Sequence, residues 1–107
     1  MLIEGKIVEC PVEIALFFIG NKWKLLIVRD LLSGTKRFGE LRKSLTGISQ
    51  KVLTQNLRTM EEHGLVKRKV YPEVPPRVEY SLTNKGESLK IIIDALWTWG
   101  SDLDMSN

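Results

Sequence analysis

The helix expected between Ser49 and Gly64 constrains the fold most, because the sequence carries signals for both of its ends. Ser49 is a good N-cap residue, and Ile48 and Leu53 stand at the two positions of a hydrophobic staple. Gly64 can adopt the left-handed conformation that closes a helix in a Schellman motif. The stripe that this helix would bury consists of Leu53, Leu57 and Met60. The other side is polar and can face a partner.

The elements around this helix predict a winged-helix architecture. In chain order they are a helix from Pro11, a helix over about 22–32, a short helix carrying Phe38, Leu41 and Leu45, the helix just described, strands within 65–71 and 77–82 joined by the loop PEVPP, and a last helix over about 84–103 capped by Thr83. Three helices followed by a hairpin form a winged helix. We therefore expect one α+β, mainly helical domain over residues 1–107, with the helix-turn-helix at about 38–63 and the wing at about 65–82.

The first and last helices carry more apolar surface than one small core can bury. The main stripe of the last helix is widened by Ile91, Ala95 and Trp99, and the first helix is apolar almost all round from Ile14 to Ile19. The three tryptophans, Trp23, Trp97 and Trp99, lie on apolar faces and are expected in the core or in a subunit interface. The pattern predicts a two-fold homodimer built from the N- and C-terminal helices.

Charge is concentrated in the middle of the chain. Residues 21–70 contain twelve Lys or Arg and four Asp or Glu, a net charge of +8, whereas residues 1–20 sum to −2 and residues 71–107 to −3. A basic middle between acidic ends indicates a face for a polyanion, although a solvated basic surface would have the same composition.

Candidate DNA-binding residues lie on the polar side of the helix after Ser49 and on the hairpin. On the helix they are Gln50, Lys51, Thr54, Gln55 and Arg58, which can read base edges or hold phosphates in the major groove. On the hairpin they are Lys67, Lys69 and Arg77, with Arg68 between the two lysines. A rigid basic loop beside a reading helix can follow the backbone and place an arginine in the minor groove. These residues favour double-stranded DNA as the partner.

The chain resembles the HxlR-type transcriptional regulators, relatives of the MarR winged-helix proteins. The matching stretches run from Cys10 to Trp99 and are CPVEIAL, GNKWKLLIVRDLLSG, RFGELRKSLTGISQKVLTQNLRTMEEHGLVKR and VPPRVEYSLTNKGESL. The resemblance implies a bacterial-type cytosolic homodimer that dimerises through its first and last helices. It also implies that residues 50–58 enter the major groove and that the loop near Arg77 enters the minor groove.

Cys10 is the only cysteine, so one chain cannot form an internal disulfide, and a reducing, cytoplasmic location is expected. A helix N-terminus favours a thiolate, although Glu9 and Glu13 oppose this at Cys10. The resemblance suggests a thiol-based redox sensor, because several HxlR-type proteins have a cysteine just ahead of the first helix. The alternative is a small capping residue without a sensing role.

Other classes of function find less support. No paired carboxylates, Ser-His-Asp order, Gly-rich phosphate loop or metal-ligand cluster is present, so neither an enzyme, a cofactor nor a metal site is expected. A nucleophilic pair of Cys10 and His63 would lack an orienting third group, and His63 fits a helix C-terminus better. No segment could span a bilayer. The main alternative is a winged-helix module that binds protein rather than DNA, and the residues specify no effector.

Overall fold

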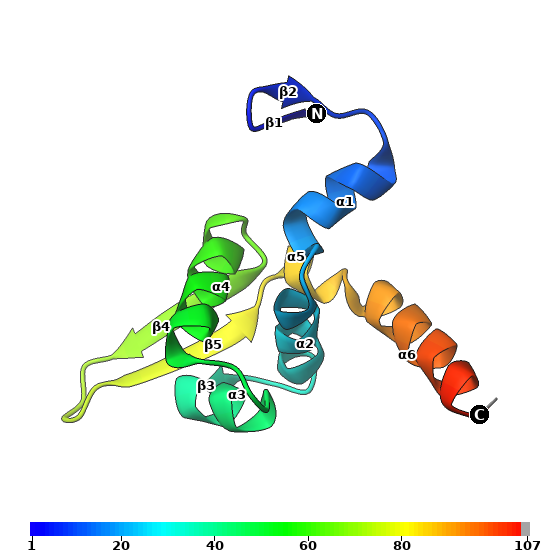
Figure 1. Cartoon of the computed structure of the whole chain (residues 1–107). Coiled ribbons are helices and arrows are strands. Elements are labelled where there is room, and N and C mark those ends of the chain that lie inside the picture. The colour runs from blue at the N-terminus through cyan, green and yellow to red at the C-terminus, as the bar shows by residue number, and fades with distance from the viewer. Residues whose placement is uncertain (106–107) are drawn as a thin grey trace.

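The computed structural model describes residues 1–105 (Figure 1). In chain order the elements are β1 (Leu2–Ile3), β2 (Lys6–Ile7), α1 (Pro11–Ile19), α2 (Lys22–Leu31), β3 (Lys36–Arg37), α3 (Phe38–Ser44), α4 (Gln50–Glu62), β4 (Val66–Tyr71), β5 (Arg77–Leu82), α5 (Asn84–Glu87) and α6 (Lys90–Met105). The strands form an N-terminal hairpin and a three-stranded antiparallel sheet in the order β3-β5-β4. The predicted class, an α+β and mainly helical winged helix-turn-helix, is confirmed.

The core lies between α2, α3, α4 and one face of the three-stranded sheet. Its fully buried side chains are Ile27, Val28, Leu41, Leu45, Leu53, Leu57, Met60 and Val66. The three residues predicted as the buried stripe of α4 are all among them. Burying each of these large side chains contributes on the order of 1.5–3 kcal/mol to folding, so the core holds α4 with its polar side outward.

The predicted ends of α4 are confirmed. The hydroxyl of Ser49 accepts the backbone N–H of Val52 at 3.1 Å, as an N-cap does. Gly64 has a φ of +73°, and the N–H of Leu65 donates to the carbonyl of Met60 at 2.9 Å. These are the left-handed residue and the six-residue hydrogen bond of a Schellman motif. Both ends are therefore closed by local chemistry.

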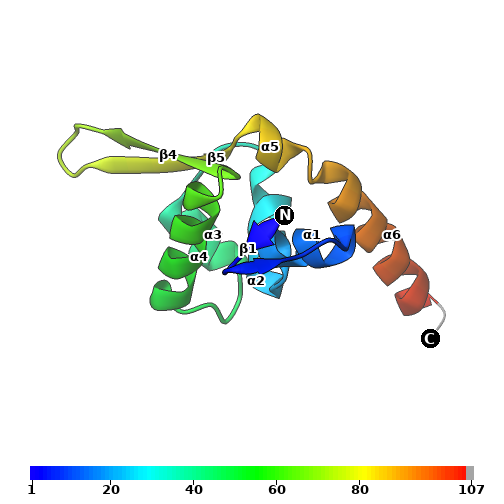
Figure 2. The same ribbon diagram turned by 90° about the horizontal axis from the view of Figure 1, so that it is seen from above.

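The last helix differs from the single helix expected over 84–103, because the chain forms two helices with a break at Ser88 and Leu89. Thr83 caps the first of them as predicted, its hydroxyl accepting the N–H of Gly86 at 3.0 Å. The N–H of Leu89 then donates to the carbonyl of Gly86 at 3.1 Å, a tighter turn than that of an α-helix. Gly86 of α5 packs against the backbone of Leu65, just before β4, and after the break α6 turns away from α5 (Figures 1 and 2).

The helix α6 projects from the winged-helix body, and none of its described residues is buried (Figures 1 and 2). Its exposed apolar side chains include Trp97 at 72% exposure and Trp99 at 66%. On α1, Val12 and Leu16 are also more than half exposed. The radius of gyration of 15.3 Å exceeds the roughly 13 Å of a compact domain of this length. The single chain thus leaves apolar surface on both terminal helices in contact with solvent.

Among the helices within residues 1–105, none has the length and apolar character needed to cross a membrane.

Candidate nucleic-acid interface

The exposed side of α4 gathers all five residues predicted for it. Gln50, Lys51, Gln55 and Arg58 are exposed, and Thr54 is half-buried. Helical spacing arranges them in two adjacent rows, with Gln50, Thr54 and Arg58 in the row nearer the wing. The helix therefore presents amide, hydroxyl and guanidinium groups on one face.

A groove of about 480 Å³ separates this face from the wing. Its lining consists of Phe38, Gln50, Thr54, Leu57, Arg58, Glu61, Arg68, Val78 and Tyr80. Arg58 on α4 and Arg68 on β4 bring a guanidinium from each side, with the carboxylate of Glu61 beside them. Each wall of the groove thus carries an arginine, a side chain that can bind a phosphate group.

The register of the wing divides its basic residues between two faces. Arg68 is paired with Tyr80, which faces the helices, whereas Lys67 is paired with Ser81 and Lys69 with Glu79 on the other face. The structure therefore does not bring the predicted Lys67 and Lys69 to the groove; it places Arg68 there. Sequence reasoning left Arg68 out of the site, although strand alternation from the buried Val66 would have assigned it to that side.

Arg77, also predicted for the site, is held within the wing. Its guanidinium carbon lies 3.8 Å from the centroid of the Tyr71 ring, and its nitrogens lie 3.6 Å from Glu73 and 3.9 Å from Glu79. The ammonium of Lys69 lies 4.9 Å from the same ring. Arg77 thus sits at the base of the loop over 72–76, partly neutralised by two carboxylates, and does not extend freely from the tip.

Cys10 and His63 lie near opposite ends of α1. Cys10 is the exposed N-cap residue of α1, and its side chain makes no capping hydrogen bond within the described chain. His63 is the C-cap of α4, as predicted, and contacts Phe17 and Phe18 near the far end of α1. A nine-residue helix spans about 13 Å, so this geometry separates the thiol from the imidazole and provides no nucleophilic pair.

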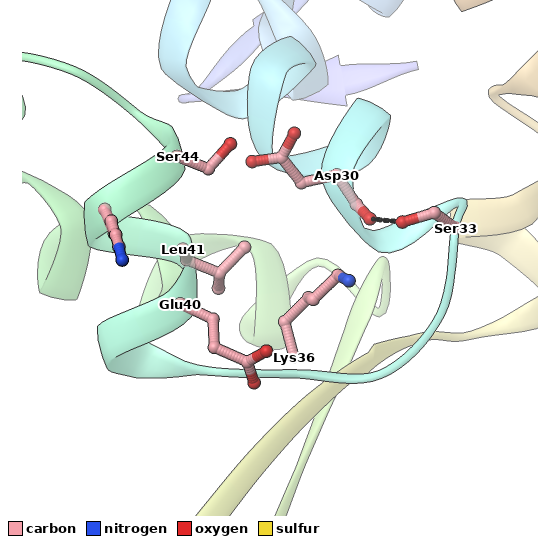
Figure 3. A pocket seen from close by; sticks show the side chains of 7 residues that line it. Asp30, Ser33, Lys36, Glu40, Leu41 and Ser44 are labelled. Atoms are coloured by element: carbon pink, nitrogen blue, oxygen red, sulfur yellow. Dashed lines mark hydrogen bonds between the residues drawn. The ribbon is translucent and has the colours of Figure 1, made fainter.

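A second cavity, of about 540 Å³, lies between α2 and α3 (Figure 3). Its lining mixes both charges and consists of Asp30, Ser33, Lys36, Glu40, Leu41, Lys43 and Ser44. Asp30 is already paired with Arg29 at 3.0 Å, and the hydroxyl of Ser33 donates to the Asp30 carbonyl at 2.7 Å. Within residues 1–105, no group of three or more His, Cys, Asp or Glu side chains is placed to hold a metal ion.

Comparisons with known proteins agree with this geometry. Residues 18–107 match the model of the HxlR-like helix-turn-helix family. An uncharacterized HTH-type transcriptional regulator of Methanothermobacter thermautotrophicus is 52% identical over 91 residues, which cover 85% of this chain and 70% of that protein.

Two solved structures have a similar fold. A transcriptional regulator of the MarR family from Porphyromonas gingivalis W83 superposes with a TM-score of 0.84 at 44% identity, covering 90% of this chain and 96% of that one. The redox regulator HypR in its oxidized form superposes with a TM-score of 0.83 at 45% identity, covering 87% and 96%. From the family match and these likenesses, the chain belongs to the HxlR-like helix-turn-helix family of transcriptional regulators.

Proposed function

We propose that this protein is a sequence-specific, double-stranded-DNA-binding transcriptional regulator that acts as a homodimer in the cytoplasm. The observation that carries the proposal is the polar face of α4, which is exposed beside a groove with an arginine on each wall. An α-helix with its side chains is about 10–12 Å across, so α4, whose 13 residues span about 20 Å, can lie in the major groove, which is about 12 Å wide.

The residues of α4 divide into readers and phosphate contacts in this proposal. Gln50 and Gln55 can pair with adenine, Arg58 with guanine, and Thr54 with either. Lys51, in the first turn of α4, can hold a phosphate near the positive end of the helix dipole. Arg68 then faces the same DNA strand from the wing, while Lys67, Lys69 and Arg77 lie on the other face of the wing.

The two terminal helices support the homodimer. Their exposed apolar side chains are Val12 and Leu16 on α1, and Ile91, Leu96, Trp97, Trp99, Leu103 and Met105 on α6. Contiguous exposed apolar surface of this kind is typical of subunit interfaces, and tryptophan is a frequent anchor there. A two-fold dimer would present two copies of α4 to half-sites about one helical turn, or a multiple of it, apart.

A thiol-based input at Cys10 is the regulatory part of the proposal. Cys10 is exposed at the start of α1, and a similar structure is that of a redox regulator. Because the chain has one cysteine, oxidation has two routes: a disulfide between the Cys10 residues of two protomers, or a mixed disulfide with a small thiol. An electrophile could instead alkylate the thiol. The competing role is that of a helix cap alone.

Fluorescence anisotropy with labelled duplex DNA over a series of salt concentrations tests DNA binding. We expect log K to fall linearly with log salt, and Arg58→Gln to reduce the slope by about 0.9 if the arginine neutralises one phosphate. If Arg58 reads a base, the change should cost on the order of 1–3 kcal/mol and relax preference at one position. Lys6→Gln, on β2 away from α4, is the matched control and should leave slope and preference unchanged. Absence of binding at low salt, or binding independent of salt, would refute the proposal.

A further inference from the structure

The recognition helix α4 is hydrogen-bonded at its middle to the start of α2. Asn56 is only 8% exposed, and its side-chain N–H donates to the carbonyl of Val52 at 2.8 Å. Its carbonyl oxygen accepts the side-chain N–H of Asn21 at 3.1 Å, although the two residues are 35 positions apart. The other side-chain atom of Asn21 accepts the backbone N–H of Lys24 at 3.0 Å, which caps α2. The side chain of Asn21 therefore performs two tasks that can be separated: it caps α2 and it bonds to Asn56 on α4.

A second contact holds the C-terminal end of α4. The His63 ring packs against two aromatic rings of α1, with centroids 5.3 Å from Phe17 and 5.0 Å from Phe18. The Nδ1 atom of His63 is buried and has no hydrogen-bond partner within residues 1–105, so the contact rests on ring packing. Lys85 supports it, because its ammonium donates to the His63 carbonyl at 2.9 Å and lies 4.8 Å from the Phe18 ring.

Both contacts come from one short stretch, residues 17–21, where α1 ends and α2 begins. They reach α4 at its middle and at its C-cap residue, neither of which lines the groove. Successive residues of a helix are about 100° apart, so Asn56 cannot shift without turning its neighbour Gln55 on the reading face. Two attachments along the helix restrain both its rotation and its tilt.

We propose that residues 17–21 are a positioning element for the recognition helix. Asn21 acts through Asn56, and Phe17 and Phe18 act through His63, so that the orientation of α4 follows the end of α1. Since Cys10 is the N-cap residue of α1, the same contacts join the candidate thiol to the proposed reading face through that helix. The inference rests on the proposed DNA binding for its functional consequence, whereas the restraint on α4 can be measured without DNA.

Two substitutions of Asn21 separate its tasks. Asn21→Ser keeps a hydroxyl that can cap α2 but loses the amide that reaches Asn56, whereas Asn21→Ala loses both. The probes are a duplex selected by the unmodified protein from a random 30-base-pair library and a scrambled duplex of equal length. We expect Asn21→Ser to reduce the affinity ratio for selected over scrambled DNA roughly three- to tenfold, the range that one hydrogen bond can supply. Asn21→Ala should lower the ratio equally and lower Tm further.

The second contact has its own matched pair. His63→Phe keeps an aromatic ring packed against Phe17 and Phe18 and should leave the ratio unchanged, whereas His63→Ala should reduce it. A merely structural role would lower Tm in Asn21→Ser and His63→Ala and leave both ratios as in the unmodified protein. That result would overturn the inference.

Hydrogen exchange of the free protein distinguishes this inference from the proposed function. Asn21→Ser should accelerate exchange of amides in α4 and leave those of α3 at their original rates. Equal acceleration in both helices indicates general destabilisation and overturns the positioning role. If the unmodified protein selects no duplex, DNA binding fails, and the exchange rates alone still decide whether residues 17–21 restrain α4.

Discussion

Replacing Gly86 with alanine tests the packing that places α5 against the wing. Gly86 is buried, and a Cβ atom built on it would lie 2.1 Å from the carbonyl oxygen of Leu65 and 3.0 Å from Cδ2 of Leu82. The first of these contacts is with the backbone between α4 and β4, which a side-chain rotation cannot relieve. The chain at Leu65 or the whole of α5 has to move instead.

The structure gives the size of the effect. Non-bonded heavy atoms are at their optimum near 3.5 Å, so a contact of 2.1 Å requires a displacement of about 1.4 Å to reach it. Overpacking of this kind costs about 1–3 kcal/mol. The Leu65 carbonyl also accepts the N–H of Thr83 at 3.1 Å, a hydrogen bond that contributes about 1 kcal/mol and would be strained by the shift. We expect Gly86→Ala to lower the free energy of unfolding by about 2–4 kcal/mol.

Gly39→Ala is the matched control, because a Cβ atom at Gly39 meets no other atom within 4 Å in the part of the chain that the structure describes. Gly39 lies in α3 with helical geometry, where alanine is favoured over glycine by about 0.5–1 kcal/mol. The two substitutions should therefore shift stability in opposite directions. Urea denaturation at one fixed protein concentration measures both, since association would make the midpoint depend on concentration. A Gly86→Ala protein as stable as the unmodified one would refute the close approach of α5.

Three further changes test the cap of α4, the association of protomers and the thiol. Ser49→Ala removes the acceptor for the Val52 N–H and should cost about 1 kcal/mol in urea denaturation, and a loss below a few tenths would contradict the cap. Trp97→Ser should shift sedimentation toward the monomer at micromolar concentration while far-ultraviolet circular dichroism stays unchanged, because Trp97 is 72% exposed in one protomer; an unaltered dimer would remove α6 from the interface. Diamide should weaken binding of the selected duplex by the unmodified protein but not by the Cys10→Ser protein. If the two proteins give identical binding curves in both the reduced and the oxidised state, the regulator responds to a signal other than oxidation of Cys10.

The sequence predicted the recognition helix well because its signals are local. A cap at Ser49, a left-handed glycine at Gly64 and an apolar stripe between them act within a few residues, and all three are present in the structure. The three-helix unit followed by a hairpin could be predicted for the same reason. The exposed polar face of α4 followed from the stripe, since a side that is not buried in a small domain faces outward.

In the wing, local sequence signals were not enough, because the face on which each residue lies depends on how β4 pairs with β5. Its two strands were predicted, and Lys67, Lys69 and Arg77 were predicted to contact DNA. The register places these three residues on the face away from α4, and their contact with DNA stays a prediction. Arg68 lines the groove, because its alternation is in phase with the buried Val66. The alternation of side chains along a strand can be seen in the sequence. Pairing with the neighbouring strand decides which of the two faces packs against the helix.

Local pattern thus determined the elements of this protein, their caps and the polar face of α4. Tertiary structure alone decided that Asn56 on α4 is buried against Asn21, that His63 packs on Phe17 and Phe18, and that Gly86 of α5 meets the backbone of Leu65. Residues in these contacts are distant in the chain, and each carries an ordinary helix-forming or capping pattern of its own. Their meeting depends on the packing of whole elements, because the free energy of the assembled core outweighs local preference.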